Sequence, residues 1–267
     1  MDDPITSRHP GSEGERLGGL FEGLLQWELP QLDARLPLFI PDLGMMTAVF
    51  SAATARVAPL LPHRDMRPIE MLPGRCLIAF AALEYRASDL GPYDEFVIAV
   101  PIGFGANLPA IASALKDALG GTASAYIWQM PVTTRRACEA GIGIAGFPKF
   151  VADIAFERQG AQLACTVSHE GRHLATLRCD TEPAGSQRTL HARSYTVKDG
   201  VPLLTALRVR QQRAVEHLHG WAASLELGSH PIADVLRTLE LSERPLATQY
   251  CPQAQAVMFF PRHVGEP

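Results

Sequence analysis

The sequence is divided into short apolar runs of strand length, and residues typical of tight turns separate most of them. The clearest turn is Asp199-Gly200, which lies between strand-like runs at residues 190–197 and 201–209. An Asp-Gly pair in this setting is a strong hairpin signal, because both residues readily adopt the positive φ angles of a tight hairpin. Three further runs predict a second antiparallel meander at residues 151–157, 162–169 and 173–179.

Helical periodicity is limited to short segments, and no strand–helix–strand repeat or Gly-x-Gly-x-x-Gly motif occurs. A nucleotide-binding α/β fold is therefore disfavoured. Many short strands with short helices at their edges are typical of a mainly β (α+β) protein whose antiparallel sheet curves or closes into a barrel. The predicted helices cover residues 17–25, 54–61, 108–119, 131–141 and 231–239. We expect Thr133 or Thr134 to be the N-cap of the fourth helix and Ser229 that of the fifth.

Composition indicates a globular chain with one large folded unit. Of 267 residues, 47% are hydrophobic and only 19% are charged, which supports a sizeable core and argues against global disorder. Residues 1–19 are polar and read as a flexible tail, so we expect a single domain over residues 20–267. The net charge of −4 and the absence of a basic run make nucleic acid an improbable partner.

Cysteine usage and the chain ends suggest a cytoplasmic protein. The five cysteines are an odd number with no Cys-x-x-Cys pair, which favours reduced thiols. The first residues lack a basic start and an apolar run, so we expect no signal peptide. No apolar run approaches the length of a membrane span, so we expect no membrane partner.

One lysine stands out chemically. The chain has 24 lysines and arginines together, and only Lys116, Lys149 and Lys198 are lysines. Lys149 lies in the apolar, glycine-rich segment 141–151, directly between Pro148 and Phe150. An apolar pocket disfavours the ammonium form of a lysine, and the neutral amine can attack a ketone or aldehyde to form a Schiff base. The plainer alternative is a lysine near a strand end that extends to solvent.

Two segments resemble the acetoacetate decarboxylase family. The first is Gly-Phe-Pro-Lys at residues 146–149, followed by an alternating strand, and the second is Leu-Gly-Pro-Tyr-Asp-Glu at residues 90–95. The order of elements also agrees from about Met45 onward. The resemblance implies a cone-shaped antiparallel β-barrel with the lysine inside, a homo-oligomer, and Glu95 as the acidic partner of Lys149. Activation of a lysine in acetoacetate decarboxylase is itself a standard example of this chemistry.

Several aromatic residues are candidate substrate contacts. Phe147 and Phe150 lie on either side of the lysine and would exclude water from its amine. Tyr93 belongs to the segment that contains Glu95. Tyr250, near the last strand, resembles a phenol that donates a proton in relatives with aldolase or dehydratase activity. A buried tyrosine can equally be structural, with its hydroxyl bonded to a neighbour.

The chain also departs from the decarboxylase pattern. Phe150 replaces a second lysine, and Gly143 replaces a glutamate six residues before the lysine. Phe80 replaces a further acid and is another candidate substrate contact. No arginine that could receive a substrate carboxylate is apparent near Leu43. The predicted site is therefore less polar than a decarboxylase site, and a larger, more apolar carbonyl compound fits it better than a small β-keto acid.

These observations predict a lyase that forms a Schiff base between Lys149 and a carbonyl substrate. Decarboxylation, aldol or retro-aldol cleavage and dehydration all use an iminium as electron sink, so the lysine alone does not separate them. The alternatives are a small-molecule-binding protein without turnover and a structural oligomer component. We expect no cofactor and no metal, because His217-Leu-His219 offers two ligands without a third nearby.

Overall fold

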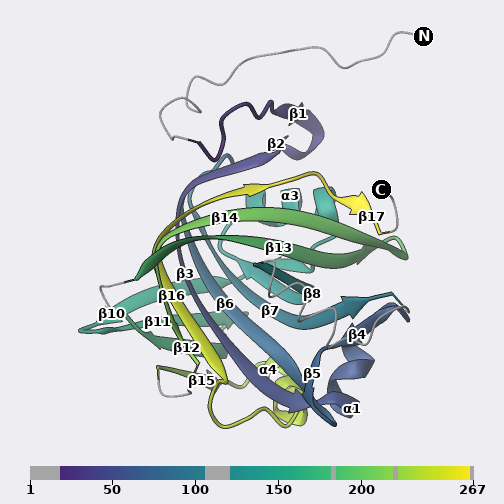
Figure 1. Ribbon diagram of the computed structural model, residues 1–267, viewed down its shortest axis with the longest axis vertical. Coiled ribbons are helices and arrows are strands. Elements are labelled where there is room, and N and C mark those ends of the chain that lie inside the picture. Colours follow the sequence, from purple (N-terminus) through teal and green to yellow (C-terminus); the bar gives the residue numbers. More distant parts are fainter. Residues whose placement is uncertain (1–18, 106–120, 182–184, 219–221, 265–267) are drawn as a thin grey trace.

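The computed structural model describes residues 19–105, 121–181, 185–218 and 222–264 (Figure 1). An eleven-stranded sheet dominates it, and the additional pairing of β7 with β8 closes seven of its strands into a barrel. The mainly β barrel predicted from the sequence is thus confirmed. The seven strands are β3 (Leu38–Ala53), β6 (Arg75–Ala87), β7 (Tyr93–Phe104), β8 (Thr122–Val132), β13 (Ser186–Lys198), β14 (Val201–His217) and β16 (Ala247–Met258).

The barrel is not fully antiparallel. β8 and β13 run parallel, with Ala123 opposite Ala192, whereas the other neighbouring pairs of the barrel are antiparallel. Parallel neighbours require a long crossover, and here the connection carries a helix and a second sheet. Its elements before β13 are α3 (Arg135–Ala145), β9 (Lys149–Val151), β10 (Asp153–Gln159), β11 (Gln162–His169) and β12 (Arg172–Asp180).

The predicted meander forms a separate four-stranded sheet. β10, β11 and β12 pair in sequence, and β15 (Ala223–Leu227) adds to the far side of β12. Figure 1 shows this sheet beside the lower part of the barrel. The remaining short elements are β1 (Trp27–Leu29), η2 (Pro30–Leu32), β2 (Ala34–Leu36), α1 (Thr54–Val57), η3 (Ala58–Leu60), β4 (Met66–Pro68), β5 (Glu70–Leu72), α4 (Pro231–Thr238), which contacts β12 and β15, and β17 (Arg262–His263).

The barrel strands bury both of their faces. Successive side chains of a strand point to opposite faces, and β6 shows the consequence. Leu83 and Tyr85 join one apolar cluster with α3, while Ile78 and Phe80 join another with residues of the four-stranded sheet and α4. The first cluster surrounds the functional site, and the second fastens the four-stranded sheet to the outside of the barrel.

The predicted N-terminal helix at residues 17–25 is wrong where the structure describes it. Residues 19–23 form a bend and a turn, and residues 24 and 25 are irregular. Gly19 and Gly23 both have φ of +74°, which interrupts a helix. Leu20 and Phe21 nevertheless bury their side chains against Val257, so their apolar character reflects packing. The predicted tail lies outside the described residues except for Gly19, and the whole of the predicted helix at 108–119 lies outside them too.

Helix α3 begins at the cap that the sequence indicated. The Thr134 hydroxyl accepts a hydrogen bond from the backbone N–H of Ala137, which satisfies a free donor of the first turn. The helix ends at Gly146, whose φ of 62° is in the left-handed region. This end fixes where the chain turns toward β9 and Lys149. None of the described helices is both long and apolar enough to cross a membrane.

Helix α4 has a different cap from the predicted Ser229. The buried His230 accepts a hydrogen bond at Nδ1 from the backbone N–H of Ile232. Its neutral ring therefore carries the proton on Nε2, which lies 3.2 Å from Nδ1 of His169 and donates to it. Burial lowers the pKa of His230, and the neighbouring His169 and Arg172 lower it further.

This cap predicts a loss of stability in acid. A His whose pKa is lowered on folding binds its proton more readily in the unfolded chain, so its contribution is present above pH ~6.5 and is lost as the pH falls. We expect the melting temperature to fall between pH 8 and 5, and to fall less in His230→Asn, where Asn can still cap. The exposed His191→Asn is the control, and equal pH slopes in wild type and His230→Asn would contradict the assignment.

Candidate functional site

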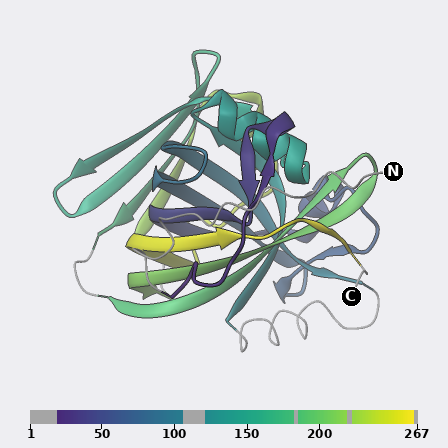
Figure 2. The same ribbon diagram turned by 90° about the horizontal axis from the view of Figure 1, so that it is seen from above.

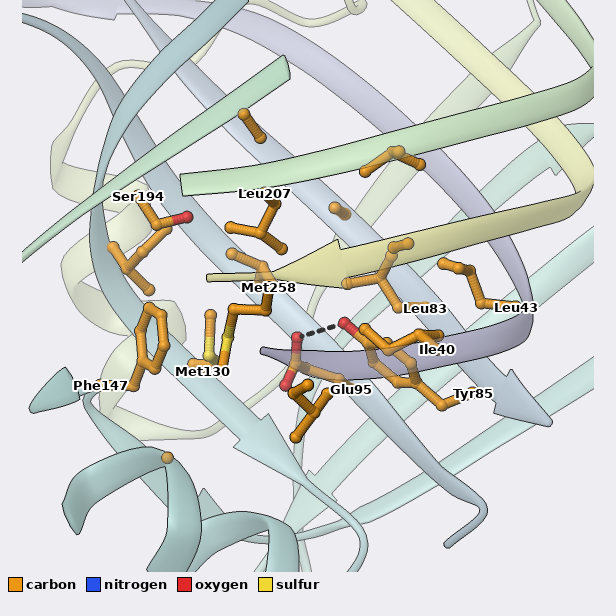
Figure 3. Close-up of a pocket in the computed structure, with 18 of the residues that line it drawn as sticks. Ile40, Leu43, Leu83, Tyr85, Glu95, Met130, Phe147, Ser194, Leu207 and Met258 are labelled. Carbon is orange, nitrogen blue, oxygen red and sulfur yellow. Dashed lines mark hydrogen bonds between the residues drawn. The ribbon is translucent and has the colours of Figure 1, made fainter. Parts of the chain in front are cut away.

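A cavity of about 210 Å³ lies inside the barrel, and all seven barrel strands and α3 contribute to its wall (Figure 3). Most of the lining is aliphatic side chains, together with Phe147 and three methionines, Met45, Met130 and Met258. Among the described residues, five side chains bring a nitrogen or oxygen to the wall: Tyr85, Tyr93, Glu95, Lys149 and Ser194. The site is therefore a largely apolar chamber with few polar groups.

The route of the chain after α3 brings Lys149 into this chamber. β9 runs parallel to β8, with Lys149 opposite Met130, and strand alternation directs the lysine inward. Gly141 of α3 faces the lysine stem, because a Cβ built on Gly141 would lie 2.6 Å from Cδ of Lys149. The glycine therefore leaves the space through which the lysine side chain reaches the cavity.

Lys149 and Glu95 form a buried ion pair at the cavity wall. Nζ of Lys149 lies 2.7 Å from Oε2 of Glu95, and the two side chains are only 6% and 5% exposed. The other carboxylate oxygen, Oε1, accepts a hydrogen bond of 3.2 Å from the hydroxyl of Tyr85, drawn as a dashed line in Figure 3. The amine is thus out of bulk water, paired, and next to an open volume.

Aromatic rings surround the amine. Nζ lies 5.5 Å from the centroid of the Tyr93 ring and 5.9 Å from that of Phe147, distances at which a cation interacts favourably with a ring face. Tyr85 and Tyr93 stack with centroids 4.4 Å apart. Burial, and secondarily the charge of Glu95, raises the pKa of Tyr85 and Tyr93 well above the usual value. Both phenols are therefore protonated at neutral pH, and Tyr85 remains a donor to Glu95.

The structure brings four of the seven site residues predicted from the sequence to one cavity: Lys149, Glu95, Phe147 and Tyr93. Phe80 lies elsewhere, because it is one residue out of phase with Leu83 and Tyr85 on β6. Its ring packs against Phe50 and Phe96 on the opposite face of the sheet. Phe150 follows Lys149 and points the other way, with its ring 4.8 Å from that of His169.

Tyr250 is also outside the barrel cavity. Its hydroxyl accepts a hydrogen bond of 2.7 Å from Arg158, and it lines a different hollow next to β10 and β11. Even-numbered residues of one regular strand would share a face, but the register of β16 shifts between Cys251 and Ala254. Because of this shift, Met258 faces the cavity and Tyr250 does not. The position of Tyr250 agrees with the alternative of a structural tyrosine whose hydroxyl is bonded to a neighbour.

Sequence reasoning missed Tyr85 and Ser194. A signal for Tyr85 was available, because a hairpin around the turn at residues 86–91 places it opposite Tyr93, two residues from Glu95. Ser194 had no such local signal. It lies on β13, which meets β8 only through the long parallel crossover.

Two departures from the decarboxylase pattern now have a structural setting. Leu43, near the position where a carboxylate-binding arginine was sought, lines the cavity. Gly143 lies on α3, where a Cβ would be 2.3 Å from Cδ2 of Leu32, a residue of η2. Figure 2 shows β1 and β2 lying close to α3 at this end of the barrel. The segment that contains Leu32 thus occupies the space that a larger side chain at 143 would need.

Gly141→Ala is expected to reduce reaction of Lys149 with carbonyl compounds by about tenfold to a hundredfold. Alanine favours a helix over glycine, so α3 should persist, but the new methyl group would displace the lysine stem. A displacement of about 1 Å can cost about a hundredfold in rate. The control is Gly143→Ala, the same change on the same helix, which crowds Leu32 instead. Equal rates for Gly141→Ala and the wild type would show that this contact does not position the lysine.

No group of three or more His, Cys, Asp or Glu side chains suited to a metal ion occurs among the described residues. The five cysteines are free and buried. The polar chemistry of the cavity is therefore that of an amine, a carboxylate, two phenols and one aliphatic hydroxyl.

Comparison with solved structures gives the same fold. An acetoacetate decarboxylase from Legionella pneumophila subsp. pneumophila str. Philadelphia 1 superposes with a TM-score of 0.63 at 12% identity, covering 98% of each chain. A second acetoacetate decarboxylase structure gives a TM-score of 0.59 at 15% identity over 85% of this chain and 89% of the other. The enduracididine biosynthesis enzyme MppR, complexed with the condensation product of pyruvate and imidazole 4-carboxaldehyde, gives 0.56 at 12% identity over 85% and 88%.

Comparison with curated protein sequences gives no significant match. The family model for acetoacetate decarboxylase matches residues 28–260, which include every barrel strand as well as Glu95 and Lys149. The chain therefore belongs to the acetoacetate decarboxylase family.

Proposed function

We propose that the protein is a lyase in which Lys149 forms a Schiff base with a carbonyl substrate and Glu95 transfers protons. The observation that carries the proposal is the position of the lysine amine, which is buried 2.7 Å from a carboxylate at the wall of an apolar cavity. A lysine that only served solubility would extend to solvent. Membership of the family supports the same reading, because its enzymes act on small carbonyl compounds.

The ion pair can supply the neutral amine without a change in net charge. Transfer of one proton from Nζ to Oε2 converts an ammonium and a carboxylate into an amine and a carboxylic acid. The amine then attacks the carbonyl carbon, and one proton passes from the nitrogen to the new oxygen to give the carbinolamine. The acid returns the second proton to this hydroxyl group, which leaves as water. The products of this step are an iminium and the Glu95 carboxylate, which is then available as a base.

Tyr85 fixes the carboxylate during these transfers. Its hydroxyl donates to Oε1, so the other oxygen, Oε2, is the one directed at the amine. We assign Tyr85 as a positioning residue, and Phe147 and Tyr93 as the apolar wall beside the amine. The cytoplasmic location expected from the cysteines and the homo-oligomeric assembly implied by the resemblance remain part of this proposal.

The second candidate is a small-molecule-binding protein that uses the same cavity without turnover. The ion pair is the observation in its favour, because a lysine held by a carboxylate can be a purely structural group. In that case the cavity would bind apolar molecules, and Lys149 would not react with them.

Borohydride trapping separates these candidates. The full chain is incubated with a panel of ketones, aldehydes and 2-oxo acids, reduced with borohydride, and examined by intact and peptide mass spectrometry. The lyase proposal expects a mass increment of the reduced carbonyl compound on Lys149. Ligand binding to folded protein without any increment on Lys149 would contradict it and favour the binding protein.

A further inference from the structure

The charges at the cavity wall cancel. Among the described residues that line it, Lys149 is the one cation and Glu95 the one anion, and they are bonded to each other. No arginine or histidine lines the cavity in the part of the chain that the structure describes. The chamber therefore offers no unpaired positive charge to an incoming molecule.

A substrate carboxylate would be costly in this chamber. An ionised carboxylate in an apolar environment needs a paired cation or several hydrogen-bond donors. The one available cation is Lys149, but an ammonium held by a substrate carboxylate is not a nucleophile. A carboxylate in the cavity would therefore either lack a partner or occupy the amine that has to react.

The remaining polar groups suit an uncharged molecule. Ser194 of β13 presents its hydroxyl to the cavity (Figure 3), and no hydrogen bond from this hydroxyl to another described residue is present. A hydroxyl can donate to a carbonyl or hydroxyl oxygen and accept from a hydroxyl group. The hydroxyl of Tyr85, by contrast, is already engaged with Glu95.

We infer that the site takes a neutral carbonyl compound with an apolar body, and that Ser194 binds an uncharged polar group of it. This inference rests on the proposed function and narrows it. A substrate without a carboxylate cannot be decarboxylated, so the reaction is cleavage or formation of a carbon–carbon bond next to the carbonyl, or loss of water. The substrate class common to these reactions is a β-hydroxy ketone or aldehyde.

The steps balance with the groups present. After the iminium forms with loss of water, the Glu95 carboxylate takes the proton of the β-hydroxyl group. The O–H electron pair forms a new C=O bond, the Cα–Cβ bond breaks, and its electrons pass through the enamine to the iminium nitrogen. An aldehyde leaves, Glu95 protonates Cα, and water hydrolyses the iminium to release the second carbonyl product. No oxidant or reductant is required.

The test compares two pairs of eight-carbon ligands, with a neutral compound and a carboxylate in each pair. Octan-2-one and 7-oxo-octanoate have the same ketone and chain length, and borohydride trapping on Lys149 is followed for each. Octan-2-ol and octanoate, which cannot form an imine, are compared by calorimetry with the same protein. We expect the neutral member of each pair to be favoured at least tenfold. Equal or better binding or trapping of the carboxylate would overturn the inference.

The two pairs separate this inference from the proposed function. Tighter binding of octan-2-ol than of octanoate, without trapping of any ketone, would support the neutral site and overturn the Schiff base. Trapping of 7-oxo-octanoate at least as fast as octan-2-one would support the Schiff base and overturn the neutral site.

A matched pair of variants tests whether the lack of an unpaired cation causes the preference for neutral ligands. Ser194→Lys places an unpaired cation at the wall, and Ser194→Met places an uncharged chain of similar length there. We expect Ser194→Lys to shift the preference toward the carboxylate at least tenfold, whereas Ser194→Met keeps the neutral preference. Circular dichroism verifies that each variant is folded. An unchanged preference in folded Ser194→Lys would contradict the role of charge, and the wild-type ligand pairs decide the inference if either variant does not fold.

Discussion

Lys149→Met is expected to abolish borohydride trapping and to reduce turnover by roughly 10⁴-fold or more, the scale on which loss of a covalent nucleophile acts. Lys149→Arg should be equally inactive, because a guanidinium stays protonated and forms no imine. The two variants should differ in stability. Methionine leaves Glu95 buried without its cation, which costs about 3–5 kcal/mol when a buried pair is broken, whereas arginine keeps a positive charge beside it.

The control for this prediction is Lys198→Met. Lys198 is half-buried and bonds to the carbonyl of Gly143 at 2.6 Å, but it does not line the cavity. Its replacement should leave trapping on Lys149 intact. Turnover by Lys149→Met within tenfold of the wild type would contradict the lyase proposal, whatever effect the replacement has on stability.

Glu95→Gln is expected to lower turnover by about 10²–10⁴-fold, the usual contribution of a general acid–base group. The amide has nearly the same shape as the carboxylate, so it can still contact Tyr85 and Lys149, but it cannot accept and return a proton. Trapping on Lys149 should be slower but should still occur, because the amine remains while the carboxylate that exchanges protons with it is gone. Trapping and steady-state turnover are measured on the same folded preparation, and turnover of Glu95→Gln within tenfold of the wild type would contradict a role of Glu95 in proton transfer.

Asp94→Asn is the matched control for Glu95. Asp94 neighbours Glu95 on β7, does not line the barrel cavity, and has its pKa raised to about 6 by burial and, secondarily, by Glu84. A raised pKa means that the folded chain holds the proton more tightly, so this carboxyl destabilises the fold as the pH rises through 6. Asp94→Asn should therefore keep turnover and unfold at an equal or higher temperature at pH 8.

The coupling between Lys149 and Glu95 can be measured directly. In a double-mutant cycle with Lys149→Met and Glu95→Gln, the second replacement removes the charge that the first leaves unpaired. The free energy of unfolding of the double variant should exceed the additive expectation by about 0.5–3 kcal/mol. Additive effects would mean that the pair contributes little to the fold.

Local features of the fold could be predicted because their causes are local. The cap of α3 at Thr134, the hairpin at Asp199-Gly200 and the meander of β10 to β12 all depend on residues within a few positions of one another. The prediction of an N-terminal helix was wrong because its cause is not local. Its apolar spacing came from contacts of Leu20 and Phe21 with distant Val257, which periodicity does not reveal.

The sequence by itself determined the strand-rich fold and the two groups at the centre of the site. A rare lysine among apolar residues pointed to Lys149, and the resemblance to the acetoacetate decarboxylase family gave it weight and supplied Glu95 as its acidic partner. The tertiary structure decided which other side chains join them. On a strand, a shift of one residue reverses the face, so Phe80 and Phe150 fall outside the cavity and Tyr85 falls within it. Irregularities such as the register shift in β16, and neighbours joined only through a long crossover such as Ser194, arise from long-range pairing that no local pattern specifies.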